Sequence, residues 1–201
     1  MISFRITITG TAPLLMHNGR LSDPIDPATK RLSAITSIKR KTDADHLDAA
    51  RAEWMGGLYW DGDEGPYMPG ENIARCIRDA ATITRQGKAV DRGIIITSLI
   101  NPIDYPGPRD PEKLWADENY RLRKSVKNQM NRVMRTRPMF RKWSLSCDGI
   151  LDENMLNFDT FTSIVENAGQ FVGLGDWRPG SPHGGNYGRF AATIENRGAL
   201  A

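Results

Sequence analysis

The chain opens with strict alternation of apolar and polar residues, which predicts a β-strand. Four apolar residues share one face of this extended segment: Ile2, Phe4, Ile6 and Ile8. Pro13 marks its end, because proline has no N–H to donate to a neighbouring strand. A dense β-branched run at 93–100, GIIITSLI, predicts a buried strand, and the segments 138–151 and 186–195 also have strand character.

Helical periodicity appears between these strands. The segment 71–84 predicts a helix that ends before Gly87. One face of that helix carries five apolar residues: Ile73, Ala74, Ile77, Ala80 and Ala81. The segment 155–169 predicts a second helix that ends near Gly169, and the segment 44–54 predicts a third.

The main elements follow the order strand, helix, strand, strand, helix, strand. This order predicts an α+β fold of the ferredoxin-like (RRM-like) βαββαβ type, with an antiparallel sheet and two helices on one face. We expect a single domain over 1–201 with two long insertions, at about 18–60 and 101–137. Inside these insertions, 18–32 predicts a polar loop and 101–119 an irregular, proline-rich excursion.

Composition adds only general limits. Of the 201 residues, 39% are hydrophobic and 25% charged, as in ordinary globular proteins. No run approaches the roughly 20 apolar residues that a membrane helix needs, and the start MISFRITITG is too polar for a signal peptide. The two cysteines, Cys76 and Cys147, form no disulfide framework, so we expect a reduced, cytoplasmic setting and no membrane partner.

Charge, by contrast, is strongly segregated along the chain. The net charge is +3, yet the segment 121–142, RLRKSVKNQMNRVMRTRPMFRK, contains nine Lys or Arg and no Asp or Glu. The rest of the chain is therefore net negative, which favours a polyanionic partner for this segment. We expect the segment to be a hairpin or a mobile arm. Its cations are candidate phosphate-binding residues: Arg121, Arg123, Lys124, Lys127, Arg132, Arg135, Arg137, Arg141 and Lys142.

Apolar residues on the C-terminal side of this segment favour nucleic acid as the polyanion, because bases stack on such surfaces. They are Met130, Met134, Met139, Phe140 and Trp143. Trp143 and Phe140 are the expected stacking residues among them. The alternative is a solvated basic arm that binds no ligand.

A glycine-rich stretch, AGQFVGLGDWRPGSPHGGNYGRFAA, lies between the second helix and the last strand. Glycines at this density predict tight turns and backbone N–H groups that can form anion-binding concavities. Arg178 and Arg189 add positive charge, and Trp177 and Tyr187 add stacking surface. The stretch has neither the lysine of a P-loop nor the strand-to-helix context of a dinucleotide fingerprint. The alternative is a glycine-rich connector with a packed tryptophan.

The stretch PYMPGENIARCIRDAA raises a question of charge. Arg75 and Arg78 lie near the start of a predicted helix, where a cation opposes the helix dipole by up to ~1 kcal/mol. Either these arginines simply face solvent, or something anionic lies close by.

Three stretches together resemble the RAMP superfamily, the RNA-binding backbone and processing subunits of CRISPR effector complexes. PYMPGENIARCIRDAA resembles the signature IPGSSLKGALR, in which a Pro-Gly turn leads into the first helix of a ferredoxin-like domain. GLGDWRPGSPHGGNYGRF resembles the C-terminal glycine-rich loop of that family, and ITITGTAPLLMHNG resembles its first strand. The chain departs from the signature at Glu71-Asn72, which stand for Ser-Ser, and at Ala74-Arg75, which stand for Lys-Gly.

The resemblance implies a compact, divergent or stand-alone relative that binds single-stranded RNA or DNA with little regard to sequence. It implies that Arg75, Arg78 and Arg85 meet phosphates of the strand, while Glu71 suits the N-terminal helix dipole. It further implies self-association along the strand, in a CRISPR-type or phage or other mobile-element ribonucleoprotein that includes other CRISPR-type subunits. No cofactor is implied.

We favour binding without catalysis. The main alternative is an enzyme. RAMP processing enzymes use a histidine as general acid or base in metal-free RNA cleavage, so the resemblance makes His17 and His183 candidates. Some backbone subunits cut target RNA with a loop aspartate; Asp23 and Asp26 are the nearest counterparts, although turns before proline explain them equally well. The cysteines and histidines, His46 included, have no zinc-site spacing. A third alternative is a protein-interaction module that engages a host complex.

Overall fold

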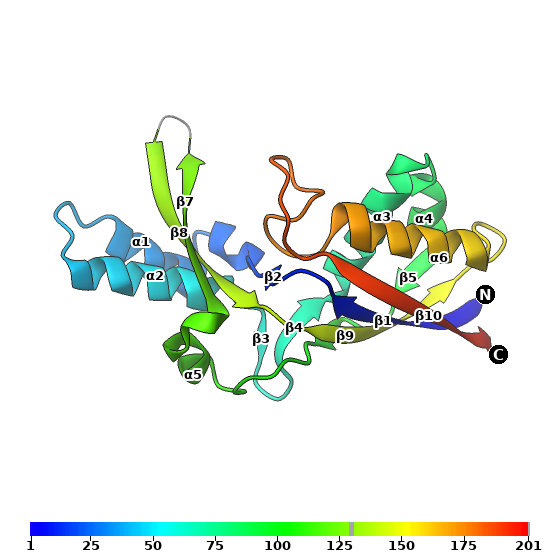
Figure 1. Cartoon of the computed structure of the whole chain (residues 1–201), viewed down its shortest axis with the longest axis horizontal. Coiled ribbons are helices and arrows are strands. Elements are labelled where there is room, and N and C mark those ends of the chain that lie inside the picture. Colours follow the sequence, from blue (N-terminus) through cyan, green and yellow to red (C-terminus); the bar gives the residue numbers. More distant parts are fainter. Residues whose placement is uncertain (129–130, 201) are drawn as a thin grey trace.

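The computed structural model describes residues 1–128 and 131–200 and has an α+β architecture with antiparallel sheets (Figure 1). Its main sheet has four strands in the order β10-β1-β9-β5, and every neighbouring pair is antiparallel. The strands are β1 (Ile2–Gly10), β5 (Ile94–Ile96), β9 (Ser144–Leu151) and β10 (Phe190–Ala199).

Two helices cover one face of this sheet and form its core. These are α3 (Gly70–Ile83) and α6 (Phe158–Asn167), with the short α4 (Gly87–Gly93) after α3. The alternating apolar residues of β1 all point into this core, as the sequence pattern predicts, and Phe4 stacks on Phe161 at a centroid distance of 4.7 Å. The predicted apolar stripe of α3 is likewise buried, apart from the half-exposed Ala74.

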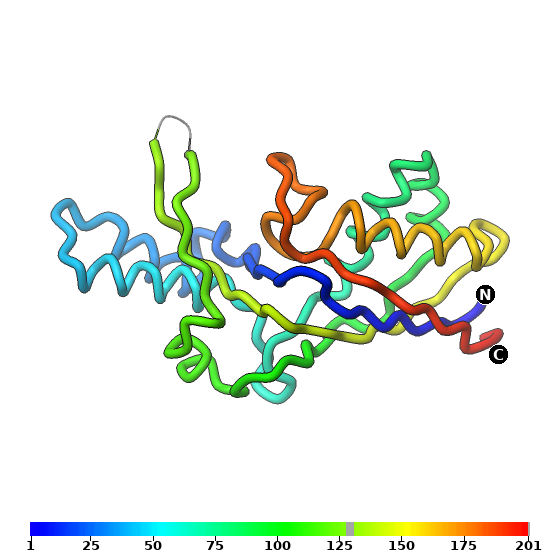
Figure 2. Tube along the Cα trace, viewed as in Figure 1, coloured from blue at the N-terminus to red at the C-terminus, as the bar shows by residue number. Residues whose placement is uncertain are grey.

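A second group of elements lies beside the main sheet. It contains α1 (Pro27–Thr36), α2 (Asp43–Gly57), α5 (Pro111–Ala116), and a three-stranded sheet in the order β2-β8-β7. The strands are β2 (Leu14–Leu15), β7 (Arg121–Asn128) and β8 (Asn131–Phe140). Trp54 of α2 anchors this group, because its buried indole N–H donates to the Tyr120 carbonyl at 2.9 Å. In Figure 2, the β7–β8 hairpin projects from the molecule far from the two chain termini.

A third, small sheet leads the chain into α3. It consists of β3 (Trp60–Asp61), β4 (Gly65–Pro69) and β6 (Ile100–Pro102). Gly70 follows Pro69 because this position has no room for a side chain: a Cβ atom there would lie 2.3 Å from the Ser98 carbonyl oxygen. The Gly70 N–H instead donates to the Leu99 carbonyl at 2.9 Å, which fixes the start of the helix.

Two strand predictions are wrong in detail. The run 93–100 is not one buried strand, because β5 joins the main sheet whereas Ile100 belongs to β6 in another sheet. Ile95 and Leu99 within it are 58% and 79% exposed. The segment 138–151 is divided between the end of β8 and the whole of β9, which lie in different sheets.

The predicted loops contain more helix than expected. The segment 18–32 holds a 3-10 turn (Gly19–Ser22) and most of α1, and 101–119 holds α5. Of the two alternatives for the basic segment, the structure has the hairpin, followed by a turn into β9. The helix α6 ends at Asn167, close to the predicted end near Gly169, and a π-helical turn (Ala168–Val172) follows it. In the described part of the chain, every helix is too short or too polar to span a lipid bilayer.

Candidate functional site

One pocket of about 230 Å³ is lined by residues from all three stretches on which the resemblance rests. His17 comes from the segment after β2, Asn72 and Arg75 come from the first turns of α3, and the remaining wall is the glycine-rich loop. The lining residues of that loop are Gly173, Leu174, Gly175, Asp176 and Arg178, and Tyr59 completes the pocket. Segments distant in sequence therefore meet at one place.

The glycine-rich loop reaches this place by packing its backbone against the chain between β1 and β2. The Asp176 N–H donates to the Leu15 carbonyl at 2.8 Å. Gly175 has a φ of 77°, and a Cβ atom at this position would lie only 2.1 Å from the Leu15 oxygen. Both the conformation and the close approach therefore require glycine.

Cys76 of α3 holds the same loop from the other side. Its Sγ donates to the Gly173 carbonyl oxygen at 3.1 Å. Burial raises the pKa of the thiol to about 12, because the apolar surroundings disfavour a thiolate. The group stays protonated and keeps its role as a donor.

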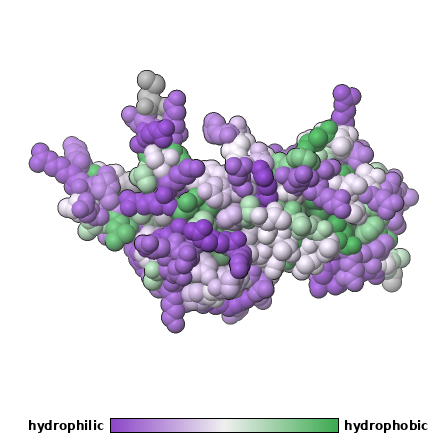
Figure 3. All heavy atoms as spheres, viewed as in Figure 1, coloured by the Kyte–Doolittle hydropathy of each residue, from purple (hydrophilic) through white to green (hydrophobic). Residues whose placement is uncertain are grey.

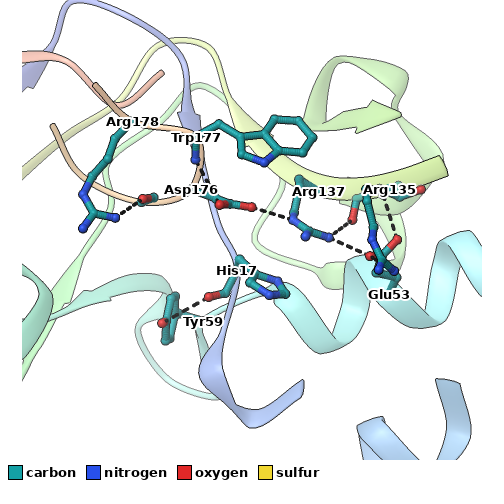
Figure 4. Close-up of polar contacts among 10 residues, drawn as sticks. His17, Glu53, Tyr59, Arg135, Arg137, Asp176, Trp177 and Arg178 are labelled. Carbon is teal, nitrogen blue, oxygen red and sulfur yellow. Dashed lines mark hydrogen bonds and ion pairs between the residues drawn. The ribbon is translucent and has the colours of Figure 1, made fainter. Parts of the chain in front are cut away.

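Arg137 at the base of the hairpin connects three elements through a buried ionic network (Figure 4). Its guanidinium, 7% exposed, donates to Glu53 of α2 at 2.7 Å and to Asp176 of the loop at 2.7 Å. Glu53 also accepts the Thr136 N–H at 2.8 Å. Because Arg137 is enclosed between two carboxylates, it is not free to meet phosphates, and the expectation for this residue is wrong for the free protein.

Trp177 stands where the hairpin and the glycine-rich loop face each other. The Nζ of Lys124 in β7 lies 5.9 Å from the centroid of the Trp177 ring, and the guanidinium carbon of Arg137 lies 5.8 Å from the centroid of the Trp177 ring as well. Tyr187 lies beside it, with ring centroids 6.3 Å apart. Lys124 therefore lies beside two half-buried aromatic rings, those of Trp177 and Tyr187. A cation next to aromatic rings is typical of sites that bind the phosphates and bases of an unpaired strand.

The outer part of the hairpin pairs like charges across its two strands. Lys124 is opposite Arg135, and Lys127 is opposite Arg132. Directly opposed like charges destabilise a hairpin. Among the described residues, the hairpin's ion pairs involve only Arg121, Arg135 and Arg137, which leaves the outer cations without carboxylate partners. The residues without such partners are Arg123, Lys124, Lys127 and Arg132. A bound anion would relieve their repulsion.

Several predicted contact residues serve the core instead. Trp143 is 4% exposed and donates its indole N–H to the Ala12 carbonyl at 2.9 Å, and Phe140 is fully buried. The expectation that they offer stacking surface is therefore wrong. Met139 is buried too, Met134 is half exposed, and Met130 lies outside the described residues.

The other predicted cations differ in their surroundings. Arg121 pairs with Glu118 and lies 4.7 Å above the Trp115 ring, so its charge is partly engaged. Arg141 and Lys142 are exposed on the turn between β8 and β9, and Arg189 is exposed after the glycine-rich loop.

The arginines of α3, which the resemblance implies to meet phosphates, occupy different surroundings in the structure. Arg75 lines the pocket and pairs with Asp79 one turn later at 2.7 Å, and Arg178 approaches the same carboxylate at 3.9 Å. Arg78 does not line the pocket and pairs with Asp91 of α4 at 2.7 Å. Arg75 and Arg178 therefore share the carboxylate of Asp79 on this side of the pocket.

Of the candidate histidines, only His17 lines the pocket, at its exposed rim. Its pKa is lowered, first because partial desolvation disfavours the charged form and second because Arg137 repels another positive charge. His183 is exposed farther along the loop. Asp26 caps α1 by accepting the Ala28 N–H at 2.7 Å, and Asp23 accepts the Ile25 N–H at 3.0 Å, as turn residues do. In the described residues no group of three potential ligands is placed to hold a metal ion.

Sequence reasoning missed the residues that organise the site. Glu53 sits in an ordinary helix, and only its buried position beside Arg137 gives it a role. Asp176 directly precedes Trp177, and the contrast of one acidic residue in a basic loop was the only available signal. The chain matches no protein-family model and no curated protein.

Proposed function

We propose that this protein binds single-stranded RNA or DNA with little dependence on base sequence. The observation that carries the proposal is the position of Lys124, which has no carboxylate partner among the described residues and lies beside the Trp177 indole. We define the strand-binding face by five residues: Arg75, Lys124, Trp177, Arg178 and Tyr187. Figure 3 shows hydrophilic residues over the outer part of the hairpin, where exposed cations lie.

Each member of this face has a distinct task in the proposed complex. The cations neutralise backbone phosphates, which gives a salt slope of about −0.7 in log K per phosphate contacted on a single strand. Trp177 and Tyr187 stack on bases, each contributing roughly 1–3 kcal/mol without selecting a base. The ionic network around Arg137 fixes the distance between the hairpin and the loop.

We further propose that the main sheet is a ferredoxin-like core and that the chain is a compact RAMP-type protein. Support comes from the order β10-β1-β9-β5, which is how a βαββαβ unit with right-handed crossovers arranges its strands. The meeting of the three RAMP-like stretches at one pocket adds to it. On this proposal, copies associate along the strand, with other CRISPR-type subunits or mobile-element proteins as partners.

The test is fluorescence anisotropy with labelled RNA, single-stranded DNA and duplex DNA of equal length. We expect both single strands to bind, and a preference between them identifies the natural ligand class. The double variant Lys124→Glu with Arg178→Glu should weaken binding at least tenfold, because two phosphate contacts are replaced by repulsion. The loss should be about the same for every oligonucleotide sequence, because phosphate contacts carry no sequence information. Lys88→Glu on α4 is the matched control, because Lys88 is exposed and outside the strand-binding face. Equal affinity of both variants, or no binding at low salt, contradicts the proposal.

A second candidate function is metal-free RNA cleavage at the pocket. It is favoured by His17, whose lowered pKa keeps the imidazole neutral and able to accept a proton at neutral pH. The imidazole would remove the 2′-hydroxyl proton, and that oxygen would attack the adjacent phosphorus and expel the 5′-oxygen, which takes a proton from water. Labelled RNA incubated in EDTA should then yield 2′,3′-cyclic phosphate ends. A His17→Ala variant that cleaves as fast as the unchanged protein rules this candidate out.

A further inference from the structure

The main sheet has two edges of very different length. One edge is β5 (Ile94–Ile96), with only three residues, and the other is β10 (Phe190–Ala199), with ten. Within the described ranges, 1–128 and 131–200, β10 pairs with β1 alone, so its other side is open. The residues of β10 from 191 to 196 are half-buried or exposed. An open edge carries unpaired N–H and C=O groups on which another strand can pair.

The hydrogen bonds of β1 show which backbone groups of β10 point outward. In an antiparallel sheet, successive residues of a strand bond alternately to the neighbour on one side and to the neighbour on the other. The Thr11 N–H donates to the Arg189 carbonyl, before β10, at 2.9 Å. The Gly10 N–H donates to the Trp143 carbonyl, before β9, at 2.9 Å. The odd positions of β1 therefore bond to β10, and the residues of β10 opposite the even positions point their N–H and C=O groups away from the sheet. These residues are Ala192, Ile194 and Asn196.

This stretch of β10 lacks the devices that usually protect a sheet edge. Proteins block such edges with proline, lysine, a bulge or a covering segment. The stretch 190–196, FAATIEN, contains neither proline nor lysine. Its one charged residue, Glu195, pairs with Arg197 at 3.5 Å. An irregularity comes only at Gly198, which has a φ of 91° and donates its N–H to the Asn196 side chain at 2.8 Å. It lies beyond the outward-pointing groups.

The spacing of the outward-pointing residues is self-complementary. Ala192 and Asn196 lie two positions to either side of Ile194. When two copies of β10 run antiparallel about a two-fold axis at Ile194, the two isoleucines face each other, and Ala192 of each copy faces Asn196 of the other. All three facing pairs then exchange both of their hydrogen bonds. Between them, Thr193 faces Glu195, so no like charges are directly opposed.

We propose that two copies of this protein associate through β10, so that their two four-stranded sheets join into one continuous antiparallel sheet. A second copy is the occupant that suits this edge, because the outward-pointing residues match themselves in one register. The association needs no nucleic acid and does not rest on the proposed function. It also differs in geometry from association along a bound strand, because a two-fold pair is closed at two copies.

Sedimentation velocity over a series of protein concentrations tests the association, on protein treated with nuclease and freed of nucleic acid. We expect a concentration-dependent conversion of one copy into two. Ala192→Pro should weaken the association by about tenfold or more, because each pair of copies loses two outward hydrogen bonds. Proline lacks only the N–H that points outward at this position, so the bonds between β10 and β1 remain. Protein that stays single at every concentration overturns the inference and leaves the edge to a strand of another protein. Unweakened association of a folded Ala192→Pro variant, with unchanged circular dichroism, also overturns it.

A cysteine at the axis tests the register without proline. Facing residues that exchange hydrogen bonds have Cα atoms about 5.5 Å apart, within the range that a disulfide spans. Ile194→Cys should therefore form a disulfide between two copies when oxidised glutathione is added. Thr193→Cys is the matched control, because the two copies of this position lie diagonally, about 7–8 Å apart, too far to be bridged. The native cysteines, Cys76 and Cys147, are buried. Equal crosslinking of both variants, or of neither, overturns the inference.

Discussion

At its base, the β7–β8 hairpin places Arg137 between two carboxylates; farther out, it places Lys127 opposite Arg132 with no carboxylate partner in the described part of the chain. The two regions share the same two strands and similar side chains. Their surroundings differ: α2 and the glycine-rich loop enclose the base, whereas the outer residues are exposed.

The comparison separates charges that are paired within the fold from charges that have no carboxylate partner among the described residues. A buried cation must be paired, because an unpaired one costs several kcal/mol. An exposed pair of like charges costs only tenths of a kcal/mol to about 1 kcal/mol, so a protein can tolerate it where a polyanion binds. The number of basic residues in 121–142 does not make this distinction. The ion pairs of the folded protein do.

The largest effect is expected at the base of the hairpin. Arg137→Ala removes the partner of two carboxylates and should lower the free energy of unfolding by about 3–5 kcal/mol, as for other buried ion pairs broken on one side. Urea denaturation followed by circular dichroism measures the change. Arg135→Ala is the matched control, since Arg135 is 40% exposed and 3.4 Å from Glu53, and should cost no more than about 1 kcal/mol. Similar losses in both variants would remove the distinction between base and outer hairpin.

Gly175→Ala tests whether the glycine-rich loop must hold Asp176 against Arg137. The alanine would adopt a positive φ and would bring its Cβ against the Leu15 carbonyl, so a loss of about 1–3 kcal/mol is expected. Gly184→Ala is the control, because Gly184 also has a positive φ of 63° but has open space around it. Amide hydrogen exchange of Asp176 should accelerate in the first variant only. If both variants lose equal stability, backbone conformation alone accounts for the effect.

Local pattern predicted the parts of this molecule in which one rule dominates. Alternation of apolar residues defined β1, and the apolar stripe with its Pro-Gly start defined α3, because burial against one layer is visible in the sequence. The prediction of one buried strand over 93–100 failed because strand propensity does not determine which sheet a residue joins. The isoleucines of this run have strand propensity, but tertiary context divides them between two sheets and exposes Ile95.

The sequence indicates which segments are rich in basic residues and glycine. It does not indicate which of the basic side chains form ion pairs. Positive charge in 121–142 and glycines in the loop pointed to two segments that lie side by side in the structure. Which cation would be neutralised depended on Glu53, a residue 84 positions away from Arg137. Trp143 and Phe140 were predicted to be exposed because basic residues lie next to them in the sequence. Both side chains are instead buried in the core, at the end of β8 and in the turn that follows it.

A smaller and more diagnostic effect is expected in the outer hairpin. Lys127→Glu converts a like-charge pair with Arg132 into an opposite-charge pair, which should raise the free energy of unfolding by about 0.2–1 kcal/mol. The same change should weaken oligonucleotide binding modestly, because it replaces a positive charge near the strand-binding face by a negative one. Stability and affinity, measured by urea denaturation and anisotropy, should therefore move in opposite directions. The stability gain should shrink in high salt. A variant that loses both, or keeps full affinity, would show that the outer cations are not held for a ligand.

The smallest effect concerns His17, which lies near both carboxylates of the network and near Arg137. Its pKa in the folded protein is below the 6.5 of an unperturbed histidine, so the unfolded chain binds a proton more readily. Stability should therefore be unaffected well above pH 6.5 and should fall slightly as the pH drops below it. A His17→Gln variant should lack this part of the decline, whereas a His183→Gln variant should retain it. The difference between the urea midpoints of the two variants at pH 5.5 and pH 8, conditions about one unit or more to either side of the unperturbed pKa, measures the effect. If His17→Gln shows the same decline as the unchanged protein, the pKa of His17 is not lowered in the folded state, and neither desolvation of the imidazole nor the charge of Arg137 acts on it.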